Sequence, residues 1–334
     1  MFELFKSIFG KEEPGRYPET LIERAIQRVV DGTDSRLSTL PGYRKSLRTP
    51  VMHAIDAVVA LIDSLPAPLS ANRDDYGKDE RLSTLFASAD RMLEVLANDS
   101  SLCEFRDSPA SGAGQATVLL LAERVEKRVL GMEMEGEMVR RDIPQVAVNF
   151  QGHRLVDPAA TTDEALRQLK RRAFDHLLSL ALTRITEVAG ERADLSNRRS
   201  LLMRKLAALQ QGGLHFDGAQ GGALDAAALQ AELDETEDQL AAIGADDRTL
   251  HAYLDIAAAV LTDAQQQLWL EGVDLYLDRM NIQRDMQDSS VRRISLTEFH
   301  NARGQRLVAL PLSVTLDELP RRDDFFTAAQ RYLG

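Results

Sequence analysis

Histidines and carboxylates near two expected β-hairpins are the residues of this sequence with the clearest chemical potential. His153 and His300 lie beside the turns of the two hairpins, and Asp157 and Glu298 are close to them in the chain. A histidine next to a carboxylate can exchange protons near neutral pH, so these four residues form a candidate acid/base site if the hairpins share one sheet. The alternative is structural, because hairpin turns recruit polar residues for their own reasons.

Recognised catalytic and cofactor-binding motifs are missing from the sequence. It has no phosphate-binding loop with its lysine, no dinucleotide-binding glycine motif between a strand and a helix, no zinc-protease motif and no nucleophile elbow. The six histidines do not show the spacing of metal ligands. We therefore expect no metal and no cofactor, and the sequence favours a non-enzymatic protein over an enzyme.

Composition indicates a folded protein in a reducing compartment. The 334 residues are 44% hydrophobic and 28% charged, and only 5% are aromatic, which favours helix over sheet. The apolar runs are too short to span a membrane, and the single cysteine, Cys103, cannot form an internal disulfide. We expect a cytoplasmic protein. With 52 acidic against 40 basic side chains, the chain would be repelled by a phosphate backbone, so no nucleic-acid partner is expected.

The longest hydrophobic pattern predicts two long antiparallel helices. Apolar residues recur at three- and four-residue intervals over 166–209 and again over 229–268, which is typical of a coiled coil. The glycine-rich stretch 212–222 cannot continue a helix cheaply and is the expected turn. The outgoing helix is net basic and the return helix, expected to reach about Arg284, is net acidic. These flanking charges favour the pairing of the two helices.

Two polar residues interrupt the apolar seam between these helices. If the turn is centred near Gly218, Arg192 lies opposite Asp247. A paired Arg and Asp at seam positions can fix the alignment of two helices, whereas either residue without the other would be costly there. We therefore expect this pair to set the register of the arm.

The turn of the arm is a candidate partner-binding site. Leu214, His215 and Phe216 lie between glycines there, where large apolar side chains gain little from the local fold. They either contact a partner or fold back onto the seam.

The first ten residues predict a short amphipathic helix. Phe2, Phe5 and Phe9 fall on one side, and Glu3 and Lys6 on the other. Because so short a helix is marginal in water, we expect it to dock on the protein's own body, on a partner protein or on a membrane surface. Its lack of net basic charge argues against the membrane.

The remaining patterns complete the expected fold. Thr49 and Pro50 predict the start of one helix in an N-terminal bundle. A 3–4 apolar spacing predicts a helix over 118–139, although 132–140 also fits a strand, and Gln151–Gly152 predicts the first hairpin turn. The expected protein is mainly α, with these segments: N-terminal helix and tether (1–15), helical bundle (16–107), helix plus β-hairpin (108–160), antiparallel coiled-coil arm (161–288), and β-hairpin with C-terminal helix (289–334).

A protein of this shape is best explained as a non-enzymatic scaffold or adaptor. Its coiled-coil arm would bind a partner protein or a second copy of the chain. The alternatives are an enzyme or ligand-binding protein with a polar site at the base of the hairpins, and a peripheral membrane protein attached through residues 1–10. Fold analogy by itself does not choose among these three functions.

Overall fold

The computed structural model describes residues 17–135, 138–210, 219–243, 246–286 and 291–320. The chain divides into two compact units, each assembled from separate stretches. The sheet unit contains Ala57–Ala173 and the chain from Gln265 onward, and the helical unit contains the chain up to Asp56 and Phe174–Ala264.

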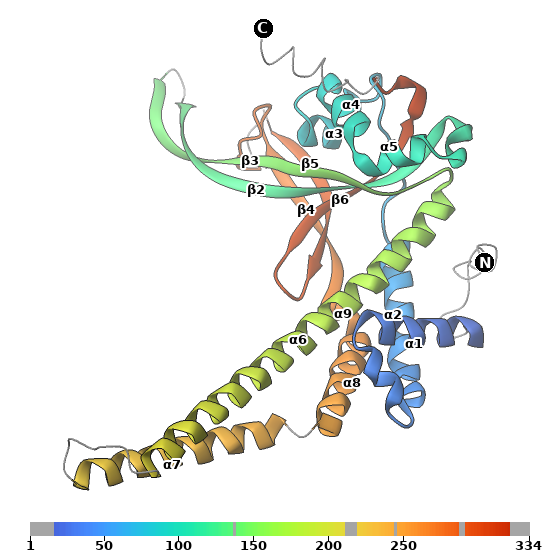
Figure 1. Cartoon of the computed structure of the whole chain (residues 1–334). Helices are drawn as coiled ribbons and strands as arrows, with labels where there is room; N and C mark the ends of the chain where they lie inside the picture. Colours follow the sequence, from blue (N-terminus) through green and yellow to red (C-terminus); the bar gives the residue numbers. More distant parts are fainter. Residues whose placement is uncertain (1–16, 136–137, 211–218, 244–245, 287–290, 321–334) are drawn as a thin grey trace, which may run out of the picture. The chain divides into compact units, whose positions relative to one another are not determined.

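A six-stranded sheet forms the centre of the sheet unit in the described part of the chain (Figure 1). Five strands follow one another in the order β3-β2-β6-β5-β4 with antiparallel neighbours, and the short strand β1 pairs with β6 in parallel. The strands are β1 (Leu69–Ser70), β2 (Gln115–Glu135), β3 (Met138–Ala159), β4 (Leu268–Leu277), β5 (Arg292–Asn301) and β6 (Arg306–Thr315).

One face of this sheet packs with three short helices into a hydrophobic core. Alternate residues of β5, such as Ile294 and Leu296, are buried in it, as expected for a strand with one covered face. The side chains of Asp79, Ser88 and Asp99 accept backbone N–H bonds at the starts of the helices, which satisfies donors that each first turn leaves free. The helices are α3 (Glu80–Leu85), α4 (Ala89–Asn98) and α5 (Ser100–Arg106).

The helical unit packs its helices through small residues and ion pairs. Gly32 approaches Leu178 so closely that a Cβ at residue 32 would lie 3.0 Å from Leu178 Cδ1. Arg28 forms a two-point ion pair with Asp175 on the same contact. The α-helices in or entering this unit are α1 (Glu19–Gly32), α2 (Tyr43–Asp63), α6 (Thr162–Gln210), α7 (Ala219–Ile243), α8 (Asp246–Thr262) and α9 (Ala264–Gln267).

Three short 3-10 helices complete the described secondary structure. They cover Ser35–Thr39, Pro109–Ala113 and Leu316–Glu318. None of the helices in the described ranges combines the length and hydrophobicity that a bilayer crossing needs.

The fold is α+β, so the expectation of a mainly α protein with a small sheet is wrong. The main error concerns 118–139, which the apolar spacing assigned to a helix; Gln115–Glu135 forms β2 and Met138 begins β3. Val118, Leu120 and Ala122 alternate into the sheet core, and Ala122 pairs with Val308 from the far end of the chain. Such distant partners decide between strand and helix where the local pattern fits both.

The hairpin turn expected at Gln151–Gly152 is also wrong, because both residues lie within β3. Gly152 has a φ of 64° and sits where the β2–β3 register shifts between Leu121 and Glu123. One extra residue on β3 with a left-handed backbone makes a β-bulge, and glycine adopts that backbone without strain. The second expected hairpin is confirmed as β5–β6, with Gly304 at a φ of 75° in its turn.

Several helix boundaries differ from the expected ones. The return helix does not reach Arg284, because α9 ends at Gln267 and Leu268–Leu277 is β4. Helix α2 begins at Tyr43, so Pro50 lies inside it rather than at its start. The expected N-terminal helix (1–10), most of the arm turn (211–218) and the C-terminal helix (321–334) lie outside the described residues.

Candidate functional site

Ionisable side chains from three strands meet around Glu298 in the sheet unit. Glu298 is only 1% exposed and accepts hydrogen bonds from Arg124 of β2, at 2.6 Å from Nε and 3.4 Å from the second guanidinium nitrogen. Arg124 also pairs with Glu126, two residues further along β2. Directly opposite Glu298 on β4 is Glu271. We call Arg124, Glu271, Glu298 and His300 the polar cluster.

Strand periodicity explains why these residues meet. In β5, Glu298 and His300 follow Ile294 and Leu296 on the core-facing side, so the polar cluster continues the row of core residues. Val308 of β6 pairs with both Glu298 and Ala122. Arg124, two residues beyond Ala122 on the same face, therefore reaches Glu298 across β6.

The charge of Glu298 is balanced by Arg124. Burial by itself would lower the pKa of Arg124, but the hydrogen bond from its guanidinium to Glu298 and the charge of that carboxylate outweigh the burial and raise it. A buried ion pair of this kind holds strands in register, and removing one partner leaves a costly unpaired charge. The pair therefore ties β2 to β5.

His300 faces two carboxylates. Its ring stacks on Trp269, with centroids 5.7 Å apart and planes inclined by 22°. Its Nε2 lies 3.3 Å from Glu298 Oε2 and 3.6 Å from Glu271 Oε2, yet it is buried without a hydrogen-bond partner. The structure thus brings His300 and Glu298 together. Within the described ranges, no three His, Cys, Asp or Glu side chains form a group that could hold a metal ion.

The other two residues of the expected acid/base site lie elsewhere. His153 Nε2 is 2.9 Å from the carbonyl oxygen of Leu85, and its ring stacks on Phe86 at 4.8 Å. Burial lowers the pKa of His153. Asp157 accepts two hydrogen bonds from Arg172, at 2.7 and 2.8 Å. His153 therefore fastens the end of α3 to β3, and Asp157 fastens β3 to α6.

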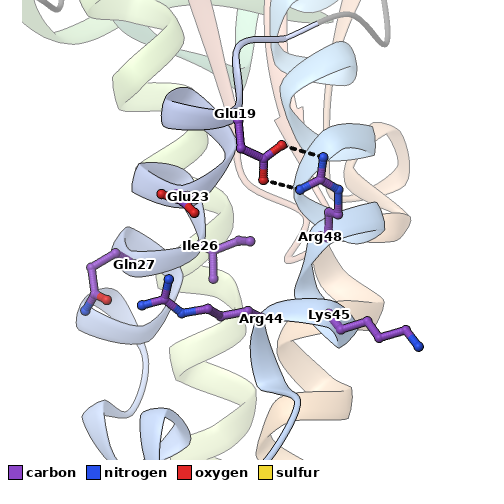
Figure 2. Close-up of a pocket in the computed structure, with 7 residues that line it drawn as sticks. All are labelled: Glu19, Glu23, Ile26, Gln27, Arg44, Lys45 and Arg48. Atoms are coloured by element: carbon purple, nitrogen blue, oxygen red, sulfur yellow. Dashed lines mark hydrogen bonds and ion pairs between the residues drawn. The ribbon is translucent and has the colours of Figure 1, made fainter.

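A cavity of about 190 Å³ lies between α1 and α2 in the helical unit (Figure 2). Arg48 and Glu19 form a two-point ion pair across it, and Arg44 donates to the Tyr43 hydroxyl at 3.0 Å. Carboxylates from α1 face cations from α2, so the cavity has no strong charge of one sign to attract an ionic ligand. The lining residues are Glu19, Glu23, Ile26, Gln27, Arg44, Lys45 and Arg48.

Strands β2 and β3 continue past β6 as a two-stranded ribbon (Figure 1). We call residues 123–135 and 138–151 the ribbon. The last pair between β2 and β6 is Ala122 with Val308, so the later residues of β2 pair on one side, with β3. Leu130 and Met132, which share one face of β2, are 71% and 63% exposed. Solvated apolar side chains on a strand with an unpaired edge are characteristic of a binding surface.

Gln145 covers the opposite face of the ribbon. Its side chain lies over Gly131, where a Cβ would meet Oε1 at 2.0 Å. The amide nitrogen donates to the Met132 carbonyl at 3.2 Å. Gln145 thus covers Gly131 on one face of the ribbon, where its cross-strand partner Val129 is 37% exposed, while Leu130 on the other face is 71% exposed.

Ion pairs link α6 to α7 in the helical unit. Arg198 binds Glu232 at 2.6 Å and Arg199 binds Glu237 at 2.7 Å. The predicted pair of Arg192 with Asp247 stays a prediction, because the Asp247 side chain is outside the described part of the chain. The predicted contact residues Leu214, His215, Phe216, Phe2, Phe5 and Phe9 are also outside it.

Sequence reasoning missed Arg124, Trp269 and Glu271 in the polar cluster, and Leu130 and Met132 on the ribbon. The available strand signal was the alternation of methionine and glutamate that begins at Met132. The preceding part was interpreted as helix because its apolar residues from Val118 to Val129 recur at three- and four-residue intervals, with Glu123 and Lys127 four residues apart as support. Comparison of the chain with models of protein families, with curated proteins and with solved structures found no match.

Proposed function

We propose that this protein is a non-enzymatic scaffold that binds another protein chain through its ribbon. The observation that carries the proposal is the exposure of Leu130 and Met132 on a strand whose outer backbone edge is unpaired within the described part of the chain. Natural proteins normally protect such edges with charges, prolines or covering segments, because an open apolar edge invites pairing with another chain. The exposed charges of Glu126, Lys127 and Arg128 protect one part of this edge, and the apolar part that follows, at Leu130 and Met132, is best explained by a partner.

The environment of the polar cluster favours a structural role over catalysis. Both carboxyl oxygens of Glu298 face the Arg124 guanidinium, and the side chain is almost fully buried. Nε2 of His300 is buried as well, and Glu271 is the more exposed of the carboxylates beside it. A general base needs contact with the proton it removes, so Glu298 is poorly suited to that task.

The paired helices α6 and α7 offer a second surface for the same function. Leu201 and Met203 of α6 are exposed large apolar residues, close in the chain to the two arginines that pair with α7. Two helices joined by ion pairs present such residues on a preorganised support, which lowers the entropy lost on binding. The single Cys103 fits a reducing compartment, and we propose the cytoplasm.

Cross-linking in native cell lysate, followed by affinity recovery of the tagged chain, tests the scaffold function. The wild type should recover a specific protein, and the double variant Leu130→Ser/Met132→Ser should lose it while keeping its thermal stability. The matched control is Met280→Ser/Met286→Ser, since these methionines are 82% and 70% exposed at another place in the sheet unit. Equal recovery by all three chains would exclude the ribbon as the binding surface.

A second candidate is a ligand-binding or catalytic site at His300. It rests on the position of His300 Nε2, which lies between two carboxylates and is buried without a hydrogen-bond partner. Native mass spectrometry of the purified protein should then detect a bound small molecule that His300→Ala loses and His153→Ala retains. The same spectrum for both variants and the wild type would remove this candidate.

A further inference from the structure

We propose that His153 makes the sheet unit open locally in mild acid: when its ring takes up a second proton, the end of α3 separates from β3 and residues 278–284 detach from the edge of β3. We call residues 278–284 the strap. All of these residues belong to the sheet unit. The opening goes beyond the scaffold function and does not depend on it.

The strap connects the two outer strands of the sheet. Ile282 forms a bridge with Ala147 of β3, and Gln283 forms one with Leu277 of β4. Strands β3 and β4 stand at the two ends of the strand order. A segment held by one bridge on each side has few hydrogen bonds to break, so it can open without unfolding the sheet.

Two backbone hydrogen bonds fasten the strap to β3. Val148 N–H donates to the carbonyl of Asn281 at 2.9 Å, and Gln283 N–H donates to the carbonyl of Val146 at 2.8 Å. Both bonds lie on the side of β3 away from β2, so the cross-strand partners of Val146 and Val148 on β2 point their backbone groups to the other edge of the ribbon. The amides of Val148 and Gln283 therefore report directly on the opening of the strap.

Asp278 shapes the strap from within. Its Oδ1 accepts the backbone N–H of Met280 at 2.8 Å and that of Ile282 at 3.0 Å, and its Oδ2 accepts from Arg284 Nε at 3.1 Å. These bonds join residues of the strap to one another. Its attachment therefore depends on the contacts that it makes with β3, β4 and α3.

Two neighbouring carbonyl groups at the end of α3 are held by side chains from the strap and from β3. The carbonyl of Thr84 accepts from Asn281 Nδ2 at 3.2 Å. The carbonyl of Leu85 lies 2.9 Å from His153 Nε2. Because a carbonyl oxygen can only accept, Nε2 of His153 carries the proton of this hydrogen bond. His153 therefore fixes the end of α3 to which the strap is attached.

Asn281 joins these contacts into a closed loop. Its carbonyl accepts from Val148 of β3, and its side chain donates to Thr84 of α3, while His153 of β3 bonds the next residue of α3. A movement of the end of α3 away from β3 therefore pulls on the strap. Loss of the His153 contact allows this movement, so protonation of the ring and release of the strap are coupled.

The surroundings of His153 disfavour a positively charged ring. The ring stacks on Phe86 with centroids 4.8 Å apart. Burial is the largest effect on the pKa of His153 and lowers it; the hydrogen bond to the Leu85 carbonyl opposes burial, and the charge of Arg91 lowers the pKa further. A protonated ring is therefore less stable in the closed arrangement than in solvent, and acid favours the open one.

The other charged groups on the elements around His153 already have partners. Asp99, which precedes α5, accepts the backbone N–H of Leu155 in β3 at 2.9 Å as well as the first donors of α5. Arg124, on the core-facing side of β2, pairs with Glu298. These groups hold the elements that surround the ring, and their own contacts do not require His153 to be charged.

The direction and size of the effect follow from proton linkage. Opening exposes the ring to solvent, where its pKa is about 6.5. Between this value and the lowered pKa of the closed protein, opening takes up a proton, so the ratio of open to closed protein rises as the pH falls. One proton changes this ratio by at most about tenfold per pH unit. From about pH 7.5 to about pH 5.5 the ratio should rise severalfold, and by no more than about tenfold.

Residue-resolved hydrogen exchange of the full chain at about pH 7.5 and about pH 5.5 tests the proposal, with each rate divided by that of a free amide at the same pH. The wild type should show the rise at Val148 and Gln283. Val129, which bonds to β3 inside the ribbon, should not change. Equal ratios at the two pH values for Val148 and Gln283 would overturn the proposal. An equal rise at Val129 would also overturn it, since the whole sheet would then be unfolding.

Two histidine variants assign the effect to one ring. His153→Gln keeps an amide that can donate to the Leu85 carbonyl but cannot take up the proton, so the rise should disappear. His176→Gln is the matched control and should keep the wild-type rise, because burial lowers the pKa of that histidine too but it belongs to the helical unit. A wild-type rise in His153→Gln, or its loss in His176→Gln, would contradict the assignment to His153.

Asn281→Gly tests the link between the end of α3 and the strap. Glycine adopts the φ of 57° at this position without strain, and it removes the donor to the Thr84 carbonyl. The variant should open more at both pH values and show a smaller further rise in acid. If it keeps the full wild-type dependence on pH, the strap is not released through α3 and the proposal fails.

Discussion

Leu130 and Pro144 are cross-strand neighbours in the ribbon, and the proline fixes which backbone groups face outward on both strands. On β3 the missing N–H closes the edge, and on β2 the same geometry leaves the N–H of Leu130 exposed. One residue pair therefore makes the two edges of the ribbon unequal. This inequality is the structural basis of the binding function that we propose.

The Arg124–Glu298 pair should dominate the stability of the sheet unit among its ion pairs. Arg124→Met leaves Glu298 buried without its partner and should cost about 3–5 kcal/mol of unfolding free energy. Arg124→Met/Glu298→Met should cost much less than the sum of the single changes. Arg293→Met is the control, because it breaks an exposed pair with Asp274 and should cost much less than Arg124→Met. Urea unfolding measures all four, and equal losses for Arg124→Met and Arg293→Met would refute this prediction.

The effect of adding a side chain at Gly131 should depend on Gln145. A Cβ at residue 131 would collide with the end of the Gln145 side chain, which must then move and lose its hydrogen bond to Met132. Gly131→Ala should cost about 1 kcal/mol in thermal or urea unfolding. In a Gln145→Ala background the same change should be neutral or stabilising, since alanine is less flexible than glycine in the unfolded chain. Additive costs would show that the two residues do not interact.

His153 should make the protein less stable in mild acid. Burial lowers the pKa of His153 in the folded protein. Between this lowered pKa and the ordinary pKa of the unfolded chain, the unfolded chain binds more protons than the folded one. The free energy of unfolding therefore falls as the pH falls through this range. The stabilisation is complete above about pH 6.5 and is lost as pH drops through the folded pKa. His153→Gln, which cannot titrate, should show a smaller loss of melting temperature between about pH 7.5 and about pH 5.5.

We expect His176 to cause the rest of the fall in melting temperature between neutral and mildly acidic pH. Burial lowers the pKa of this histidine as well, and it belongs to the helical unit. His176→Gln should therefore remove a further part of the slope. A pH profile that neither substitution changes would contradict the assignment of acid sensitivity to buried histidines.

The register of the helical arm gives another prediction. If Arg192 pairs with Asp247, Asp247→Leu should destabilise the protein by about 1 kcal/mol, because Arg192 is half-buried and loses the attraction of that carboxylate. The double variant with Arg192→Leu should recover most of that loss. Thermal unfolding of the two single variants and the double variant measures the coupling. Additive effects would mean that the two residues are not partners.

Elements with a purely local signal could be predicted from the sequence. The long apolar repeat predicted the helices that form α6, α7 and α8. The turn residues near Gly304 predicted the β5–β6 hairpin. Strand β2 could not be predicted, because Glu123 and Lys127 have helical spacing and the residues that decide for a strand are far away. Gly152 correctly indicated a left-handed backbone conformation, but that conformation forms a β-bulge and not a hairpin turn.

The candidate site was predictable only in part for the same reason. Two residues two positions apart in a strand share a face, so the proximity of Glu298 and His300 follows from the hairpin itself. Arg124 lies 174 residues from Glu298 and reaches it because β6 joins β2 to β5. The open edge of β2 is also invisible in the sequence, since it depends on where β6 ends.

Residue-resolved hydrogen exchange, with and without the protein that the chain recovers from lysate, tests the central claim most directly. The amides of Glu126, Arg128 and Leu130 should exchange quickly in the chain alone, because they point to an open edge, while Val125 and Val129 stay slow through their bonds to β3. Adding the recovered protein should slow the first three amides and leave the other two unchanged. Amides of Glu126, Arg128 and Leu130 that exchange equally quickly with and without that protein would contradict binding through β2, and amides that are slow in the chain alone would contradict the open edge itself.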